Sequence, residues 1–334
     1  MSMSNRVLEI FHHQRQLHTP FVIARSSRTV TDTITVKIHQ DGVCGVGECV
    51  PTKRYGELVS SVIAQLNDMR DLIESGISRQ QLQQQLPHGA ARNALDCALW
   101  DLEAKVQGIR VNDLLKCSEP KAIPTVQTIS IGTPEEMGLA AKKLANFPML
   151  KVKLNQENIY QRVRAVHENA PNAKLLIDAN ESWNFDTLTS ALTALKELPV
   201  CMIEQPFSQG QDNYLSDVSS NIPIGADESC HHVGDIEYLK QYYDVINIKL
   251  DKCGGLTEAL NMIKAAKVAN LKVMVGCMVG SSLSMAPALY VAMQADYIDL
   301  DGPTMLSQDV EHALSYHNGI IKSLPPALWG GNAK

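Results

Sequence analysis

The chain has 334 residues, of which 45% are hydrophobic and 20% charged, and its formal net charge is −6 at pH 7. This length allows two domains, or one barrel with an appended unit, and the composition is that of a globular protein. The negative charge argues against a nucleic-acid or anionic-membrane surface, and the sequence holds no run of about 18 apolar residues that could span a membrane.

The first stretch, "MSMSNRVLEIFHHQRQ", is polar every few positions and lacks the apolar segment of a secretory signal. We therefore expect a cytoplasmic protein. The eight cysteines form no CxxC pair and no Cys/His metal spacing, which favours buried, reduced thiols. The sequence leaves open whether copies of the chain associate into a homo-oligomer.

Up to about residue 120 the pattern is that of an α+β unit. Alternating apolar residues predict strands and a 3.6-residue apolar period predicts helices. In chain order, we expect strands at 32–40 and 43–49 around the turn "DG", and helices at 61–76 and 90–108. Gly108 stands where a helix C-cap would.

From about residue 121 the pattern changes to short apolar strands separated by helical stretches. These strands are expected at 149–154, 174–180, 200–206, 222–229, 245–250, 272–278 and 297–303. Strand followed by helix, repeated, predicts a parallel sheet in an α/β fold.

Each of these strands ends in a side chain that could carry chemistry. In order, these are Lys153, Asp178, Glu204, Asp227, Lys249, Cys277, and then Asp299 or Asp301. Successive members lie 22 to 28 residues apart, about one strand–helix unit each. In a barrel all strand C-termini converge on one face, so we expect these side chains to meet there. An open doubly wound sheet would usually carry a Gly-rich phosphate loop, and no GxGxxG or GxxxxGK[ST] is present.

Three of these residues are carboxylates on consecutive strand ends, namely Asp178, Glu204 and Asp227. Each alone could be a helix N-cap after a strand. Together they would repel one another unless a cation lies among them, and oxygen ligands of this kind suit Mg²⁺. The sequence therefore predicts a magnesium site.

Lysines flank this triad, Lys153 one strand before it and Lys249 one strand after it. Two bases facing one metal indicate a carbon acid held between them, provided that the lysine pKa falls from about 10.4 towards roughly 7 to 8. Lys151 points to the same side of its strand as Lys153. As a like charge, it would disfavour the protonated form of Lys153.

Together, these motifs resemble the enolase superfamily, in its muconate-lactonizing-enzyme-like subgroup, and within it the dipeptide epimerases, most closely the L-Ala-D/L-Glu epimerases. The resemblance covers essentially the whole chain. The segments "HTPFVIARSSR" and "GVGECVPTKRYGE" look like two mobile capping loops, "GAARNALDCALWDLEAK" like a capping helix, and "KVKL", "IDANESW", "EQP", "ADES", "NIKLDKCGG" and "DLDGP" like barrel motifs.

The resemblance implies an α+β capping domain over residues 1–120, a (β/α)7β modified TIM barrel over 121–313, and a C-terminal segment, 314–334, that returns to the capping domain. It implies Mg²⁺-dependent epimerisation of a dipeptide, L-Ala-D/L-Glu, in murein peptide recycling. Lys153 and Lys249 would be the acid/base pair, Asp178, Glu204 and Asp227 the metal ligands, and Lys151 a partner of the substrate carboxylate.

Substrate recognition is predicted from two further groups. In the dipeptide epimerases that this chain resembles, an Asp-x-Asp on the last barrel strand holds the free ammonium, and Asp299 and Asp301 match it. The alternative is a structural turn before Gly302 and Pro303. Arg25 and Arg28 are both candidates for binding the distal carboxylate of the substrate, because a guanidinium can grip a carboxylate at two points.

Other functions stay open at this point. A Schiff-base aldolase could use Lys153 or Lys249 as its nucleophile, but it would not need the three carboxylates. A barrel retained as a silent binding protein would not need both lysines and all three acids. Within the superfamily, a cycloisomerase, a dehydratase or a dipeptide epimerase of different specificity is chemically near.

Overall fold

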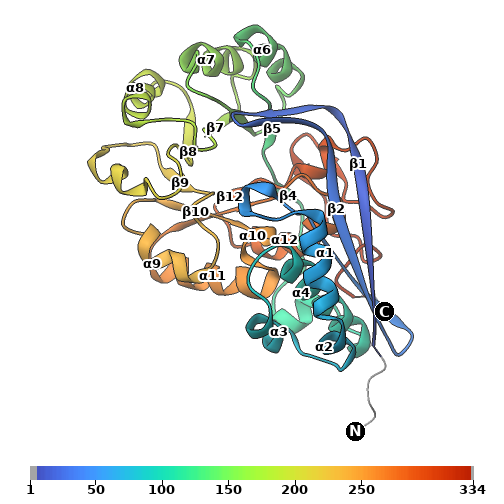
Figure 1. The fold of residues 1–334 in the computed structure, drawn as a ribbon. Coiled ribbons are helices and arrows are strands. Elements are labelled where there is room, and N and C mark those ends of the chain that lie inside the picture. Colours follow the sequence, from blue (N-terminus) through green and yellow to red (C-terminus); the bar gives the residue numbers. More distant parts are fainter. Residues whose placement is uncertain (1–5, 332–334) are drawn as a thin grey trace.

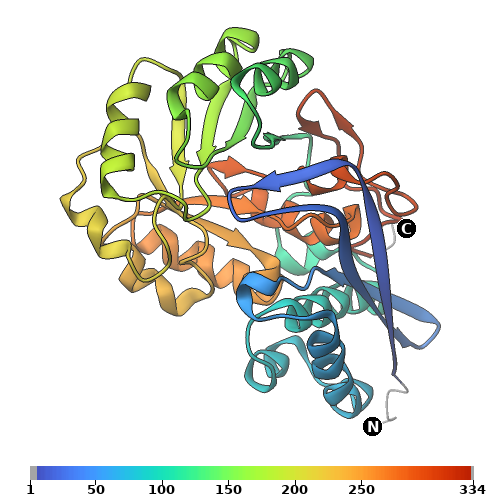
Figure 2. The ribbon, with the colours of Figure 1, turned by 45° about the horizontal axis from the view of Figure 1, so that its top comes forward.

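The computed structural model describes residues 6–331, and it shows an N-terminal unit packed against a barrel (Figures 1 and 2). The N-terminal unit joins a three-stranded antiparallel sheet of order β1-β2-β3 to a group of helices. Its strands and helices are β1 (Val7–Ile23), β2 (Ser26–Gln40), β3 (Val43–Cys49), α1 (Val59–Asp68), α2 (Arg70–Glu74), α3 (Arg79–Gln85), α4 (Ala90–Gln107) and α5 (Val111–Leu115).

The predicted strands at 32–40 and 43–49 are confirmed as the end of β2 and as β3. The turn between them places Asp41 at φ 51° and Gly42 at φ 80°, the left-handed backbone that a two-residue hairpin turn requires. The predicted helix at 90–108 is α4, and Gly108 ends it with φ 65°. The predicted helix at 61–76 is divided into α1 and α2 at Met69.

The α4 helix lies directly on β3, and two glycines make this close approach possible. A Cβ atom on Gly45 would lie 2.3 Å from Ala98 O, and one on Gly47 would lie 2.2 Å from Ala94 O. No side chain fits between this strand and this helix, which explains why "GVG" interrupts an otherwise apolar strand.

The barrel is an eight-stranded parallel sheet in sequential order from β5 to β12. A backbone hydrogen bond of 2.9 Å from Val126 N to Ile298 O joins its first edge to its last, so the sheet curls round. The strands are β5 (Gln127–Ile129), β6 (Met149–Lys153), β7 (Lys174–Asp178), β8 (Val200–Glu204), β9 (Ile224–Ala226), β10 (Val245–Lys249), β11 (Lys272–Gly276) and β12 (Tyr297–Ile298).

Helices alternate with these strands and cover the outside of the barrel (Figure 1). They are α6 (Pro134–Lys143), α7 (Ile159–Asn169), α8 (Phe185–Leu195), α9 (Ile236–Leu239), α10 (Leu250–Cys253), α11 (Leu256–Val268) and α12 (Ser282–Ala292). Between β8 and β9 the connection is a 3₁₀-helix, Asp212–Asp217, in place of an α-helix. The predicted (β/α)7β architecture is confirmed with this one shorter connection.

The first barrel strand, β5, has three residues and was not predicted. The strands predicted at 222–229 and 297–303 are shorter than expected, at three and two residues. The segment "HTPFVIARSSR", expected as a capping loop, is mostly the tip of the long β1–β2 hairpin, with a turn at Ala24 and Arg25 between the paired Ile23 and Ser26.

A small antiparallel sheet of β4 (Ile123–Pro124), β14 (Ile320–Ile321) and β13 (Tyr316–His317) was not predicted either. Further along, Trp329 Nε1 donates to Val46 O at 3.0 Å and Gly330 N to Asp101 Oδ1 at 2.8 Å, which ties the end of the described chain to the N-terminal unit. The domain boundaries themselves, 1–120, 121–313 and 314–334, stay a prediction.

The floor of the barrel is apolar. Leu176, Met202, Val245 and Met274 form a buried cluster there together with Val126. Because side chains two residues apart point to the same side of a strand, Asp178, Glu204 and Lys249 are directed into the barrel above this floor.

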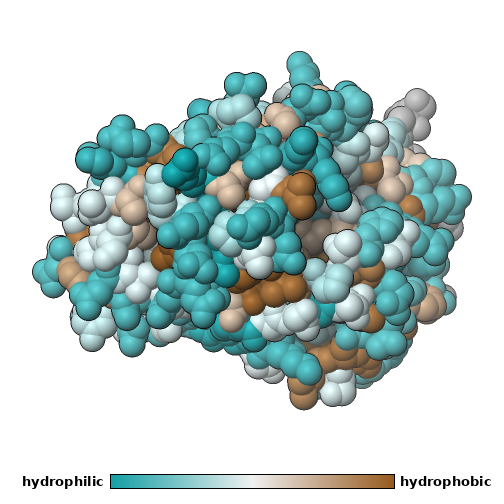
Figure 3. All heavy atoms as spheres, turned by 90° about the horizontal axis from the view of Figure 1, so that it is seen from above, coloured by the Kyte–Doolittle hydropathy of each residue, from teal (hydrophilic) through white to brown (hydrophobic). Residues whose placement is uncertain are grey.

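The face of the molecule seen from above is mainly hydrophilic, with apolar residues in small separate patches (Figure 3). Within residues 6–331, every helix is too short or too polar to cross a membrane.

Candidate active site

The predicted site residues gather at the C-terminal ends of the barrel strands. Lys153, Asp178, Glu204 and Lys249 are the last residues of β6, β7, β8 and β10. Asp227 and Asp299 each stand one residue beyond their strands. Their order around the barrel follows the strand order, so the three acids lie between the two lysines.

The lysines and acids form a buried charge network. Lys153 Nζ donates to Asp178 Oδ2 at 2.6 Å, and Lys249 Nζ donates to Asp227 Oδ2 at 2.6 Å. Lys151 pairs with three carboxylates at once, because its Nζ lies 3.0 Å from Asp178, 2.6 Å from Glu204 and 2.7 Å from Asp299.

This network controls the pKa values of its members. Although burial alone would lower the pKa of Lys249, the Asp227 carboxylate raises it above its ordinary value. Burial would likewise lower the pKa of Lys151, but the carboxylates around it raise this pKa well above its ordinary value. The expected fall of the lysine pKa is therefore not what the structure shows for Lys249, since its nearest neighbour is an anion.

The carboxylates are not equivalent. Lys151 and Lys153 hold the pKa of Asp178 below its ordinary value in spite of its burial. Burial and the neighbouring Asp178 raise the pKa of Glu204 to about 8. The three acids cannot all be ionised at low cost without positive charge among them.

The chemistry of these acids fits a hard cation. Glu204 Oε1 accepts from Asn247 Nδ2 at 2.6 Å, but Glu204 Oε2 is buried and no donor among residues 6–331 is directed at it in a hydrogen bond, even though Lys151 is close. As the side chains stand, no three carboxylate, imidazole or thiolate groups in the described chain converge tightly enough to hold a metal. Lysine ammonium groups balance the acids instead, so metal binding would require these ion pairs to be exchanged.

Asp299 and Asp301 face different partners. Asp299 Oδ2 pairs with Lys151, whereas Asp301 Oδ2 accepts from the backbone N–H of Thr128 at 2.7 Å. Asp301 is also the first residue of a turn, since its carbonyl accepts from Thr304 N at 2.9 Å. Burial and the Asp299 charge raise the pKa of Asp301 to about 7. Asp301 thus has a structural contact besides any role toward a ligand.

The two candidate arginines differ sharply. Arg25 binds Glu181, donates to Glu228 Oε1 at 2.8 Å, and donates to Asn180 O at 2.6 Å. In residues 6–331 the Arg28 guanidinium has no hydrogen bond or ion pair within 4.0 Å, and burial lowers its pKa.

Arg28 lies on the ring of Phe21, with its Cζ 5.5 Å from the ring centroid. Lys153 Nζ lies 5.9 Å from the same centroid. Within the described residues, Arg28 is therefore a half-buried cation without a salt-bridge partner, and it shares the neighbourhood of one aromatic ring with a predicted catalytic lysine.

Several site residues were missed by the sequence interpretation. Lys252 Nζ lies 2.6 Å from Asp227 Oδ1 and donates to Asn247 O at 3.1 Å, so Asp227 lies between two lysines. Its position one helical turn after Lys249 was a usable signal. Glu228, in "ADES", is buried beside Asp227, and Glu181, in "IDANESW", follows Asp178 by three residues. Nothing in the sequence indicated that arginines would pair with these two glutamates.

Comparison with known proteins gives the chain a family. Residues 5–116 match the mandelate racemase / muconate lactonizing enzyme N-terminal domain, and residues 136–325 match the enolase C-terminal domain-like family. Together these matches span most of the chain.

Among curated relatives, the L-Ala-D/L-Glu epimerase of Escherichia coli strain K12 is 44% identical over 316 residues, covering 94% of this chain and 98% of that protein. An N-acetyl-D-glutamate racemase of a Pseudoalteromonas species is 42% identical over 302 residues, covering 89% of this chain and 95% of that protein.

Solved structures are similar along nearly the whole chain. An enolase family member from Agrobacterium tumefaciens, with bound sodium and L-Ala-L-Glu, has a TM-score of 0.95 at 42% identity and covers 97% of this chain and 100% of its own. A dipeptide epimerase from Methylococcus capsulatus, complexed with Mg and L-Arg-D-Lys, has a TM-score of 0.88 at 32% identity, with 95% and 97% covered.

Proposed function

The chain belongs to the enolase superfamily, and from that premise we propose that it epimerises an L-Ala-D/L-Glu dipeptide by proton transfer at the α-carbon of the C-terminal residue. Its relatives make it an isomerase of the racemase and epimerase class. The finer parts of the proposal are the substrate, the need for Mg²⁺ and a role in murein peptide recycling.

One observation carries the proposal. Two lysines end strands β6 and β10, and three carboxylates lie between them in strand order. Both lysines are buried at the open end of the barrel, Lys153 at 6% and Lys249 at 7% exposure. A substrate α-carbon held between them would have one amine on each face, which is what inversion by two bases requires.

In this proposal Asp178, Glu204 and Asp227 hold Mg²⁺, as their oxygen donors suit. The ion would supply stabilisation of the negative charge that develops on the substrate carboxylate when the α-proton leaves. Release of Lys153 and Lys249 from Asp178 and Asp227 would free both amines to exchange a proton with the α-carbon. Lys151, which stays buried at 1% exposure, adds a fixed positive charge beside the same carboxylate.

Recognition of the acidic side chain is assigned to Arg28 rather than Arg25. Arg25 already binds two carboxylates and a carbonyl, whereas Arg28 has no anionic partner within salt-bridge distance in the described chain. A glutamate side chain next to the reaction centre would meet Arg28 beside Phe21. The anion would restore the charge balance that burial of Arg28 leaves open.

Asp299 and Asp301 would hold the dipeptide ammonium. A second candidate substrate is an N-acylated glutamate, which lacks this ammonium. Two observations favour it: a relative at 42% identity is an N-acetyl-D-glutamate racemase, and Asp299 already has a cationic partner in Lys151. Both substrates share the acidic side chain, so both would use Arg28.

The two substrates can be separated by one comparison. We would measure kcat/KM for L-Ala-L-Glu and for N-acetyl-L-glutamate with Mg²⁺, following the change of configuration by circular dichroism. A clear preference for the dipeptide supports the proposal. Turnover of the acylated amino acid alone would assign the site to the second candidate, and turnover of neither would contradict both.

A further inference from the structure

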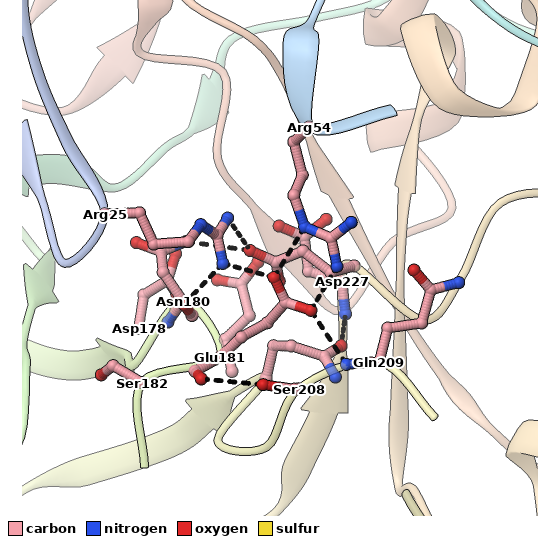
Figure 4. A network of polar contacts seen from close by, with 12 residues as sticks. Arg25, Arg54, Asp178, Asn180, Glu181, Ser182, Ser208, Gln209 and Asp227 are labelled. Carbon is pink, nitrogen blue, oxygen red and sulfur yellow. Dashed lines mark hydrogen bonds and ion pairs between the residues drawn. The ribbon is translucent and has the colours of Figure 1, made fainter. Parts of the chain in front are cut away.

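One carboxylate beside the site, Glu181, receives arginines from two separate segments of the N-terminal unit (Figure 4). Arg25, in the turn between β1 and β2, binds Glu181 Oε2. Arg54 donates to Glu181 Oε2 from Nε at 2.8 Å and to Oε1 from Nη2 at 2.5 Å. The two segments are thus held to the loop after β7 through one side chain.

The acceptor is buried and the donors reach it from the solvent side. The Glu181 side chain is 5% exposed, whereas those of Arg25 and Arg54 are 33% and 36% exposed. Gln209 N also donates to Glu181 Oε1, at 2.9 Å. Glu181 therefore belongs to the wall of the barrel opening, and the arginines bring the hairpin tip and the 3₁₀-helix Lys53–Tyr55 to it.

The backbone around Glu181 is strained to place it there. Asn180 has φ 44° and Glu181 has φ 65°, the left-handed region that residues other than glycine rarely adopt. The hydrogen bonds from Asn180 N to Asp178 Oδ1 at 2.9 Å and from Glu181 N to Gln205 O at 2.8 Å hold this turn. Two consecutive residues in this conformation indicate that the direction of the Glu181 side chain matters.

The hairpin tip and the 3₁₀-helix that Glu181 holds both carry side chains near the predicted active site. Arg28 and Phe21 flank the turn that Arg25 anchors, Arg28 stacks on Phe21, and the Phe21 ring lies next to Lys153. The neighbour of Arg54 is Tyr55, whose ring lies edge-on to His231 at 5.3 Å. Fixing Arg25 and Arg54 therefore also fixes Phe21 beside Lys153 and Tyr55 beside His231.

We propose that Glu181 is a positioning residue that closes both segments of the N-terminal unit over the active site as one piece. Loss of its charge would leave Arg25 and Arg54 close together with Glu228 alone to balance them, so the two guanidinium groups would repel and both segments would loosen together. The consequence for substrate binding rests on the proposed function, since it acts through Arg28.

The closure itself is tested on the free protein, without substrate. Amide hydrogen exchange would be compared in wild type, Glu181→Gln and Glu168→Gln. Glu168 is the matched control, because it pairs with Arg164 on the exposed surface of α7. We expect exchange about fivefold to tenfold faster in both 22–27 and 52–57 on Glu181→Gln, and unchanged exchange in the control. Unchanged exchange, or loosening of one segment without the other, would overturn the proposal.

A kinetic split tests the consequence for binding. Glu181→Gln should raise KM for the acidic substrate about tenfold and change kcat by less than about threefold, and Glu181→Asp should recover part of the loss because the charge is kept. Arg54→Gln should bring no further loss on top of Glu181→Gln, since both delete the same contact and the second change also removes the repulsion between Arg54 and Arg25. A fall in kcat at constant KM would contradict the positioning role of Glu181. The melting temperature of each variant, measured alongside, shows whether the variant is still folded. An absence of turnover in wild type would count against the proposed function and leave the exchange result standing.

Discussion

Lys249 Nζ lies 2.6 Å from Asp227 Oδ2, and Lys153 Nζ lies at the same distance from Asp178 Oδ2 on the other side of the site. Each predicted base is therefore paired with a predicted metal ligand. If Asp178 and Asp227 held Mg²⁺, as proposed, Lys153 and Lys249 would lose these ion pairs, so metal binding and the availability of the two amines would be linked.

Replacing Asp227 by Asn should weaken Mg²⁺ binding and abolish turnover while the barrel stays folded, because one of three anionic ligands is lost. Metal binding is measured by calorimetry and folding by circular dichroism. Because Lys252 also pairs with the Asp227 carboxylate, we expect the Lys252 side chain to rearrange locally in this variant. Full activity of the wild type in excess EDTA would rule out the metal site.

Changing Lys249 to Ala should stop epimerisation but still allow Lys153 to exchange the α-proton of one epimer with solvent, since abstraction and return can use a single base. Proton NMR in D₂O follows each epimer separately. If the variant exchanged both epimers, the assignment of one lysine to each face would be wrong.

Arg28→Gln should cost about 2 to 5 kcal/mol in transition-state binding of a substrate with an acidic side chain, the range for breaking a hydrogen-bonded charge pair. L-Ala-L-Gln, which lacks the distal charge, should lose much less. The four values of kcat/KM isolate the interaction between the guanidinium and the side chain. Equal losses on both substrates would return the role to Arg25 or to another cation.

Asp301→Asn tests the ammonium site in the same way, with L-Ala-L-Glu and its N-acetyl derivative as the two substrates. A loss of about 2 to 5 kcal/mol on the free dipeptide alone is expected if Asp301 binds the ammonium. The contact from Thr128 N to Asp301 Oδ2 offers the other explanation, a structural one. Similar losses on both substrates would favour it.

The sequence predicted well which side chains would come together, because a barrel brings the C-terminal ends of successive strands to one face. Lys153, Asp178, Glu204 and Lys249 stand at the last position of their strands for this reason. Periodicity could not reveal β5, whose three residues are too short to show a pattern.

The contacts of Glu181 were beyond sequence reasoning for another reason. Its arginine partners lie 127 and 156 residues away in the chain, and the contact depends on a left-handed turn at Asn180 and Glu181. Asparagine tolerates such a turn, but its presence does not indicate where the next side chain points. Likewise, Arg25 and Arg28 could be told apart only by their neighbours.

A stability prediction concerns Asp96, a buried residue of α4. Burial raises its pKa from 3.8 to about 6. A raised folded-state pKa means that this group favours the folded state below its unfolded pKa, and that this contribution is lost as the pH rises through about 6. The difference corresponds to about 3 kcal/mol at pH 8.

Asp96→Asn should therefore flatten the fall in stability between about pH 4 and pH 6. Gln83 Nε2 donates to Asp96 Oδ1 at 2.9 Å while its own Oε1 has no partner in the described chain, so a flip of the Gln83 amide would accommodate the new Asn. Urea unfolding at several pH values measures this. Parallel profiles for wild type and variant would show that Asp96 titrates normally.

The decisive experiment is incubation of the wild-type protein with L-Ala-L-Glu and Mg²⁺ in D₂O, followed by NMR and chiral analysis of the glutamate. Inversion by two bases predicts that L-Ala-D-Glu forms and carries α-deuterium from the first turnover, because the proton that is returned comes from a different lysine than the one that took it. A dipeptide that keeps its α-proton and its configuration in the presence of Mg²⁺ would contradict the proposal.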